Sequence, residues 1–210
     1  MKSPLRILVL YYSRHGSVET MANKVAFGIE KAGCEAVLRT VPSLAVPSII
    51  EDRQQRADDF EDRQKNEGTG DAFVTEQDLK DCHAIALGSP ARFGNMAASM
   101  KQFWETTSIQ WLSGDLIDKP ASVFTSSSSM HGGNESTLLT MMLPLLHHGM
   151  LIQGLPYSEP ALNATLTGGT PYGASHVAGL NNDSNLSADE TELCIALGFR
   201  LAQTTRKLNQ

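Results

Sequence analysis

The feature that most constrains the fold is the stretch from Leu5 to Ala32, in which an apolar run, a polar turn and an amphipathic segment follow one another. Residues 5–12 are apolar apart from Arg6, which is typical of a strand covered on both faces of a parallel sheet. From Val18 onward apolar residues recur at helical spacing, so this segment predicts a helix with one buried face. The stretch therefore predicts the strand–turn–helix unit of an α/β fold.

The same alternation continues along the chain. Further strands are expected at residues 35–41, 83–89, 121–125 and 150–155, and helices at 96–107 and 134–146. Pro144 should kink or end the second of these helices, and a capping box from Ser187 to Glu190 predicts the start of a last helix. We therefore expect one domain over residues 1–210, an α/β fold with an open five-stranded parallel sheet and helices on both faces.

Two segments interrupt this alternation. Residues 42–77 are dense in charge, which favours a solvated surface insertion that is partly helical; an interface or lid element is the alternative. Residues 156–186 are rich in Gly, Asn, Thr and Pro and lack periodicity, so we expect a long loop there.

Composition narrows the class of protein. The chain has 210 residues and a formal charge of −6, which argues against a nucleic-acid-binding surface. Its three cysteines are far apart in sequence, which favours reduced thiols in a cytoplasmic protein over disulfides or zinc. The apolar runs are too short to span a membrane.

Three loops rich in Ser and Gly follow the first, third and fourth predicted strands, at residues 13–18, 88–95 and 126–133. Because ligands of open parallel sheets bind outside the carboxyl ends of the strands, we expect these loops to meet at one edge. In the first loop, Ser17 is the expected N-cap of the following helix, and a helix N-terminus is suited to a phosphate. An ordinary helix cap is the alternative for this loop taken alone, because it matches neither phosphate-binding glycine motif.

The same residues are compatible with two other kinds of site. Ser89 with His131, His147 or His148 could form a hydrolase site, but the G-x-S-x-G motif is absent. The three histidines could bind a metal ion, but adjacent histidines on a helix do not readily face one ion. By default, Phe93 and Trp111 are core or interface aromatics.

Several stretches resemble the WrbA-type NAD(P)H:quinone oxidoreductases, a family of flavodoxin-like FMN proteins. The matching stretches, in the order of that family, are LVLYYS (Leu8–Ser13), ETMA (Glu19–Ala22), GSPARFGNMA (Gly88–Ala97), KQFW (Lys101–Trp104), ASVF (Ala121–Phe124), HHGM (His147–Met150) and GGTPYGA (Gly168–Ala174). They extend over nearly the whole chain, so the resemblance implies a flavodoxin-like fold.

The resemblance also implies a role for each loop. The ribityl phosphate of FMN would bind Ser13, Arg14, His15, Gly16, Ser17 and Val18. The isoalloxazine would lie against Ala91, Arg92, Phe93, Gly94 and Asn95. Backbone donors to its pyrimidine end and to the ribityl chain would come from Ser126, Ser127, Ser128, Ser129, Met130, His131, Gly132 and Gly133. His147 would lie at the open face of the flavin, as a cofactor contact and catalytic residue, and Trp111 would wall the substrate pocket.

By the same resemblance, NAD(P)H would pass a hydride to FMN, and a quinone would then receive two electrons in the same pocket. The family is tetrameric, and neighbouring subunits complete its sites. A flavodoxin-type one-electron carrier and a tetrameric regulatory or scaffold flavoprotein are the alternatives. The chain departs from the family at His15, where a tyrosine is common, at the serine tract 126–129 and at Pro144. The departures at His15 and the serine tract leave open the preference between NADH and NADPH.

Overall fold

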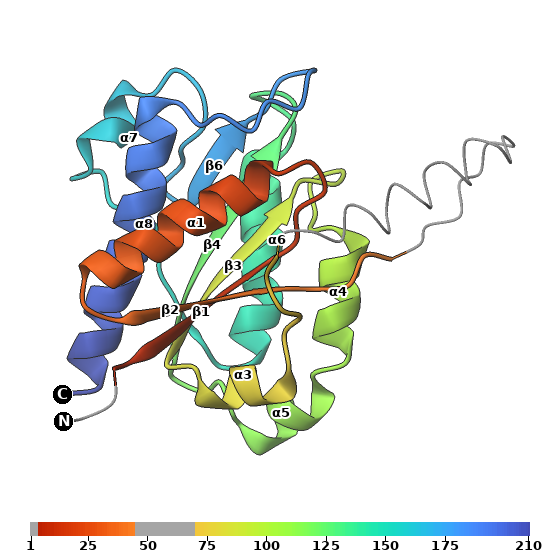
Figure 1. Cartoon of the computed structure of the whole chain (residues 1–210), viewed down its shortest axis with the longest axis vertical. Helices are drawn as coiled ribbons and strands as arrows, with labels where there is room; N and C mark the ends of the chain where they lie inside the picture. Colours follow the sequence, from red (N-terminus) through yellow and green to blue (C-terminus); the bar gives the residue numbers. More distant parts are fainter. Residues whose placement is uncertain (1–3, 45–69) are drawn as a thin grey trace, which may run out of the picture.

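The computed structural model describes residues 4–44 and 70–210 of the chain. Within these residues six strands form one parallel sheet (Figure 1). The strands are β1 (Arg6–Tyr11), β2 (Glu35–Thr40), β3 (Ala84–Pro90), β4 (Pro120–Ser127), β5 (Leu151–Ile152) and β6 (Ala174–Val177). Their order is β2-β1-β3-β4-β5, with β6 also paired to β4, so the predicted open parallel α/β sheet is confirmed.

One position of the sheet is shared by two short strands. β5 pairs with Pro120 and Ala121, and β6 pairs with β4 from Phe124 to Ser127. The predicted strand 150–155 is shorter than expected because the chain leaves β4 early: the amide of Leu155 donates to Pro171 O at 3.0 Å. The five predicted strands thus occupy five positions, and β6 is an additional strand that continues the fifth.

The segment 156–186 is more ordered than predicted. It contains a short helix, α7 (Pro160–Ala164), as well as β6. The expected long loop therefore contains two short elements, which are too short to show a periodicity in the sequence. Of the charged insertion 42–77, residues 45–69 lie outside the described part, so the prediction of a partly helical surface segment there concerns residues that are not described.

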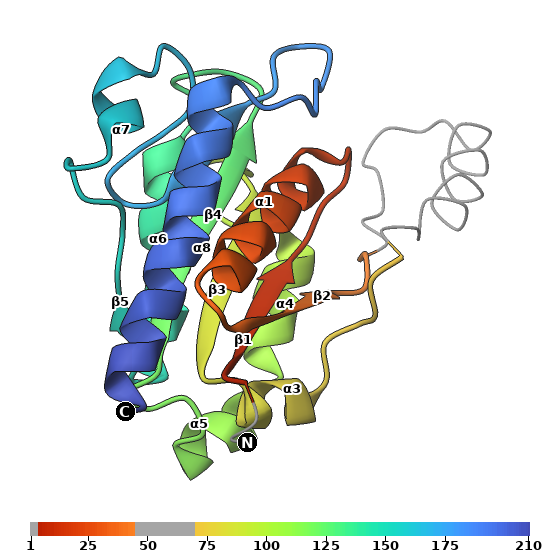
Figure 2. The same cartoon turned by 60° about the vertical axis from the view of Figure 1, so that its left-hand side comes forward.

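Helices cover both faces of the sheet (Figures 1 and 2). α1 (Ser17–Lys31) and α8 (Ala188–Leu208) pack over Ile7, Val9 and Tyr11 of β1. α4 (Ala98–Glu105) and α6 (Asn134–His147) pack over the alternate residues Leu8 and Leu10. This alternation is what a strand buried on both faces requires, and it produces two separate cores.

Helix boundaries follow local signals. The capping box of α8 is present, since Ser187 and Glu190 exchange side-chain and backbone bonds as predicted. The predicted helix 96–107 ends at Glu105, and a separate helix that was not predicted, α5 (Ser108–Ser113), follows it. Pro144 lies inside the last turn of α6, which ends at His147.

A further helix, α3 (Glu76–Asp81), precedes β3. No described helix has the length and apolarity to cross a membrane.

Candidate functional site

The loops that follow β1, β3 and β4 lie together at the carboxyl edge of the sheet. The amide of Tyr12 donates to Gly88 O at 3.0 Å, and the amide of Ala91 donates to Ser126 O at 2.8 Å. The hydroxyl of Thr140 on α6 has two acceptors for its one hydrogen, Gly94 O at 3.3 Å and Thr137 O at 3.0 Å. These bonds join the first loop to the second, and the second to the third loop and its helix, so the structure brings the three loops into one edge.

Two long helices begin at this edge, and each is preceded by a glycine with positive φ. Gly16 (φ 89°) precedes α1, and Gly133 (φ 86°) precedes α6. Because glycine has no side chain, neither N-cap residue occupies the first amides of its helix. A Cβ at Gly133 would lie 3.1 Å from the Cα of Gly94, so the two loops approach too closely for a side chain there. Two helix N-termini without side-chain caps therefore lie at this edge of the sheet, and each is suited to an anion or a carbonyl oxygen.

The structure corrects the prediction that Ser17 is the N-cap of the first helix. Gly16 has that position, and Ser17 is the first helical residue. The hydroxyl of Ser17 donates to Asp183 O at 3.3 Å, and Ser13 Oγ accepts from the amide of Gly16 at 3.1 Å. The turn is therefore held by bonds to its flanks, and the segment that contains Asp183 is a neighbour that sequence reasoning missed.

Three basic side chains surround the first turn. Partial burial, then the charges of Arg14 and Arg92, lower the pKa of His15. Burial and the charge of Arg14 likewise lower the pKa of Arg92. Arg14 and Arg92 therefore lie close enough for their charges to repel each other, and a bound phosphate dianion would relieve that repulsion.

The second loop presents an aromatic side chain to solvent. Phe93 is fully exposed and has φ 53°, a left-handed conformation that costs a non-glycine residue energy. The loop is closed by a pair of backbone bonds between Arg92 and Asn95, of 2.8 and 3.1 Å. The ring is thus held outward at the edge, where a planar ligand can stack on it.

The third loop is shorter than predicted at its start. Ser126 and Ser127 are buried residues of β4, whereas Ser128, Ser129, Met130, His131 and Gly132 are exposed. At the first residue of α6, Asn134 is 3% exposed, and its Oδ1 has no hydrogen-bond partner among the residues described. An orphaned buried acceptor beside two open helix N-termini fits a ligand with both an anionic group and N–H donors, as FMN has.

Trp111 and His147 lie away from the edge at which the three loops meet. The indole Nε1 of Trp111 donates to His147 O at 2.8 Å, so these two residues are neighbours. His147 is the last residue of the 14-residue helix α6. At about 1.5 Å per residue, the two ends of such a helix are roughly 20 Å apart. Within one chain, the structure therefore does not bring Trp111 and His147 to the edge that contains Gly133.

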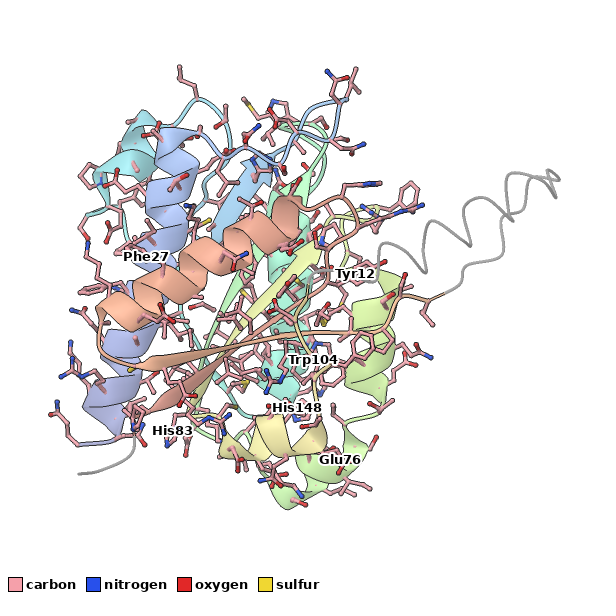
Figure 3. The ribbon with its side chains drawn as sticks, in the orientation of Figure 1. Tyr12, Phe27, Glu76, His83, Trp104 and His148 are labelled. Atoms are coloured by element: carbon pink, nitrogen blue, oxygen red, sulfur yellow. The ribbon has the colours of Figure 1, made fainter. Side chains whose placement is uncertain are left out.

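A groove of about 630 Å³ runs between α4–α5 and α6, from the second loop towards the far end of α6. It is lined by Asn95, Met96, Lys101, Trp104, Glu105, Thr107, Ser108, Trp111, Thr140, Leu143, Pro144, His147 and His148. Figure 3 shows Tyr12 beside the loop edge, with Trp104 and His148 towards the other end of the molecule. The groove connects the region of Asn95 with that of His147.

His148 is a residue of this groove for which the resemblance suggested no role. The hydroxyl of Thr107 gives its hydrogen to Trp104 O at 2.7 Å, so it accepts from His148 Nε2 at 2.9 Å. Burial and the neighbouring His147 lower the pKa of His148. The ring is therefore neutral, and its Nδ1 is a buried acceptor without a partner among the described residues. The paired histidines at a predicted helix end were the only sequence signal.

The hydrolase and metal alternatives do not form. The hydroxyl of Ser89 is buried and accepts from the amide of Ala97 at 2.8 Å, inside the second loop. His131 precedes α6, whereas His147 and His148 are at its other end. In the described part of the chain, no three His, Cys, Asp or Glu side chains could hold a metal ion.

The fold and the site define a class, the flavodoxin-like proteins. The crystal structure of a flavodoxin, WrbA-like protein from Agrobacterium tumefaciens matches with a TM-score of 0.64 and 22% identity, covering 98% of this chain and 99% of that one. A flavodoxin from the domain Archaea matches with a TM-score of 0.60 and 17% identity, covering 96% of this chain and 99% of that one. At these identities the likeness shows the fold alone, and it confirms the predicted flavodoxin-like architecture.

Sequence comparison then gives the family. The family model described as NADPH-dependent FMN reductase matches residues 5–158. A protein of Chromohalobacter salexigens that is named NAD(P)H dehydrogenase (quinone) is 41% identical and covers 97% of this chain and 98% of its own length. A protein of Geobacter sulfurreducens with the same name is 40% identical, with coverages of 98% and 100%. The chain belongs to the NADPH-dependent FMN reductase family.

Proposed function

We propose that this chain is an FMN-dependent oxidoreductase that uses NAD(P)H to reduce a quinone to a hydroquinone. The observation that carries the proposal is the pair of helix N-termini, at Gly16 and Gly133, that open on one positively charged edge. The name shared by relatives that are 41% and 40% identical over nearly the whole chain supports the two substrates.

The three loops would hold the cofactor. The turn from Ser13 to Val18 would bind the phosphate through the first amides of α1, with Arg14 and Arg92 supplying positive charge. The loop from Ala91 to Asn95 would offer the exposed ring of Phe93 for stacking. Amides of the loop from Ser126 to Gly133 would donate to the carbonyl oxygens of the flavin. When bound, FMN supplies the redox chemistry of hydride uptake from a nicotinamide and two-electron delivery to a quinone.

The groove forms one wall of the substrate pocket, and this pocket lies beside the cofactor of a neighbouring subunit. His147, His148 and Trp111 are too far from the loops of their own chain to reach a flavin bound there. The helices α5 and α6 also carry apolar side chains that are 44–76% exposed, of which Leu143 lines the groove, namely Ile109, Leu112, Leu139, Leu143 and Leu146. Such a surface is typical of an interface that is buried in an oligomer. A homotetramer in which each groove faces a neighbouring cofactor edge accounts for both features.

The proposal also includes the domain organisation of the chain and its location in the cell. The chain is a single domain, residues 1–210, whose charged insertion at residues 42–77 departs from β2 close to the first loop. The three cysteines are free and buried, which suits the reducing cytoplasm, and the net charge of −6 suits a protein that does not bind nucleic acid.

Anaerobic stopped-flow spectroscopy tests the function. Protein reconstituted with FMN should lose its flavin absorbance rapidly on mixing with NADPH or NADH and regain it on mixing with benzoquinone. Steady-state assays should then show catalytic consumption of the quinone. Bound FMN that reacts with neither nicotinamide, but exchanges electrons with a protein partner, would instead support the one-electron carrier.

A further inference from the structure

A buried charge pair lies directly behind the first loop. His176, on β6, and Glu190, on α8, are each 2% exposed, and His176 Nδ1 is 2.9 Å from Glu190 Oε2. The other ring nitrogen, Nε2, is 2.8 Å from the carbonyl oxygen of Asp183. A carboxylate and a carbonyl can only accept hydrogen bonds, so both ring nitrogens donate, and His176 is an imidazolium.

The carboxylate of Glu190 is saturated by donors. Its Oε1 accepts from the amides of Gly168 (2.9 Å) and Val177 (3.0 Å), and its Oε2 accepts from the amide of Ser187 at 2.8 Å. Burial alone would raise the pKa of Glu190, but the bonds from His176, Ser187 and Val177 outweigh it and hold the pKa at about 2. Glu190 is therefore a fixed negative charge that ties together β6, the 168–169 turn and the start of α8.

The imidazolium connects this charge to the phosphate turn through a single carbonyl group. Asp183 O accepts from His176 Nε2 and also from the hydroxyl of Ser17, the first residue of α1, at 3.3 Å. A Cβ at Gly16 would lie 3.7 Å from Ser184 Cβ, which is van der Waals contact. The segment 178–187 thus forms the back wall of the turn, and His176 is the side chain that holds its middle.

We propose that His176 is a positioning residue for the phosphate of the flavin nucleotide: its imidazolium, clamped by Glu190, fixes the segment 178–187 against Gly16 and Ser17. Loss of the proton from His176 removes one of its two bonds and loosens the wall. Affinity for the phosphate then falls as the pH rises. The identity of the ligand rests on the proposed function, whereas the clamp is a property of the protein alone.

The surroundings of His176 determine the direction of this effect. The charged groups that act on it in the described residues are Glu190 from α8 and Asp183 from the segment 178–187, both negative. On β4, the residue paired with His176 is Ser126. On α1, Ser17 shares the carbonyl oxygen of Asp183 with His176, and neither serine carries a charge. Burial lowers the pKa of His176, but the bonds to Glu190 and Asp183 outweigh burial and raise it. The imidazolium is therefore retained to a higher pH than that of a free histidine.

The ligand test compares FMN with riboflavin, which lacks the phosphate, by fluorescence titration of the apoprotein from pH 7.5 to 9.5. This range lies above the second phosphate pKa, about 6, so the ligand keeps its charge. Wild-type affinity for FMN should fall across the range. His176→Gln should bind FMN about tenfold more weakly at pH 7.5, the size expected for one charged hydrogen bond, and show a flatter profile. Riboflavin affinity should be the same in both proteins.

The control is His83→Gln, the same substitution at a partly buried histidine that accepts a hydrogen bond from the amide of Arg6 and lies at the other end of the sheet. Its FMN affinity and pH profile should match those of the wild type. Equal losses of FMN and riboflavin in His176→Gln, or an unchanged FMN affinity with a wild-type profile, would overturn the proposal.

Two measurements on the protein itself separate failure of the clamp from failure of the proposed function. In the apoprotein, amide hydrogen exchange of residues 178–187 should be faster in His176→Gln than in the wild type, with α4 and α6 unchanged. Imidazole nitrogen shifts of the wild type should show both ring nitrogens of His176 protonated at pH 7. A neutral His176 ring in the wild type, or unchanged hydrogen exchange in His176→Gln, would overturn the clamp even if the protein binds FMN. If both measurements support the clamp but the protein does not bind FMN, only the proposed ligand is rejected.

Discussion

The two ends of α6 differ in almost every property. At the Gly133 end, backbone and side-chain bonds connect three loops, basic side chains surround the opening, and the groups that face it come from one chain. At the His147 end, an open groove is lined in part by the exposed Leu143, and the buried atoms Trp104 Nε1 and His148 Nδ1 lack partners among the described residues. In the function that we propose, the first end binds the cofactor, and the second is completed by a neighbouring subunit.

This difference separates cofactor binding from substrate turnover. Anchoring the phosphate requires oriented amides and positive charge, which a helix N-terminus supplies locally. Holding a planar substrate against a flavin requires a second wall, and the residues that we propose for it, Trp111 and His147, lie roughly a helix length away from the loop edge. Changes at the groove should therefore affect assembly and turnover, while changes at the loop edge should affect cofactor affinity.

The largest effect is expected for Leu143→Glu. Leu143 is 56% exposed and lines the groove, so in an oligomer the new carboxylate would be buried without a partner. An uncompensated buried charge costs about 3–5 kcal/mol, enough to dissociate the subunits at micromolar concentration. Sedimentation velocity should show smaller species. Leu166→Glu, at a residue 85% exposed and far from the groove, should leave the sedimentation coefficient unchanged.

The charge clamp behind the loop edge should give the protein a distinct acid transition. The pKa of Glu190 is about 2 in the fold against 4.5 for the free side chain. A lowered pKa contributes stability above pH 4.5 that is lost as the pH falls towards 2, and the shift corresponds to roughly 3 kcal/mol. Urea unfolding of Glu190→Gln should show that loss already at pH 7 and lack the step between pH 4.5 and 2. A variant with the wild-type pH dependence would mean that Glu190 does not supply the step.

Trp111→Ala should reduce turnover without releasing the cofactor. Removing a large aromatic wall should lower kcat/KM for the quinone about 30-fold, or about 2 kcal/mol, while FMN affinity stays within a few tenths of a kcal/mol. Phe27→Ala is the matched control, since Phe27 is 54% exposed and Trp111 52%, and Phe27 lies on the opposite face of the sheet. A proportional loss of FMN from Trp111→Ala would place Trp111 in the cofactor site.

The smallest effect is expected for Gly16→Val. At φ 89° a side chain adopts a left-handed conformation, which costs about 1–2 kcal/mol and should weaken FMN about tenfold if the turn must keep its shape to bind the phosphate. Gly33→Val has the same strain at φ 81° and lies at the far end of α1. Fluorescence titration should show normal FMN affinity for Gly33→Val; equal affinities in the two variants would argue against a phosphate at the first turn.

Local patterns in the sequence predicted the local structure. The apolar spacing from Val18 onward and the capping box of α8 both correspond to what the structure contains, because each depends on a few neighbouring residues. The N-cap was misplaced by one residue because the Ser17 hydroxyl bonds to Asp183, a residue 166 positions away. Such a contact between distant segments leaves no periodic signal.

The site itself was only partly predictable. The convergence of the three loops followed from the parallel order of the strands, since carboxyl ends share an edge. The separation of His147 from this edge could have been deduced as well: a helix predicted over residues 134–146 is already too long for both of its ends to contact one flavin. By contrast, β6 and the clamp of His176 and Glu190 depend on pairing between segments without periodicity, so no pattern pointed to them.

Subunit complementation tests most directly the claim that the loop edge of one chain works with the groove of another. Gly133→Val should lose FMN, because its Cβ would lie 3.1 Å from the Cα of Gly94, but its groove stays intact. The double variant Trp111→Ala, His148→Ala has an altered groove, but its loop edge stays intact. Each variant alone should be nearly inactive with NADPH and benzoquinone. Co-expressed and purified as mixed oligomers, they should recover quinone turnover well above the sum of the two, whereas purely additive activity in proven mixed oligomers would contradict the account.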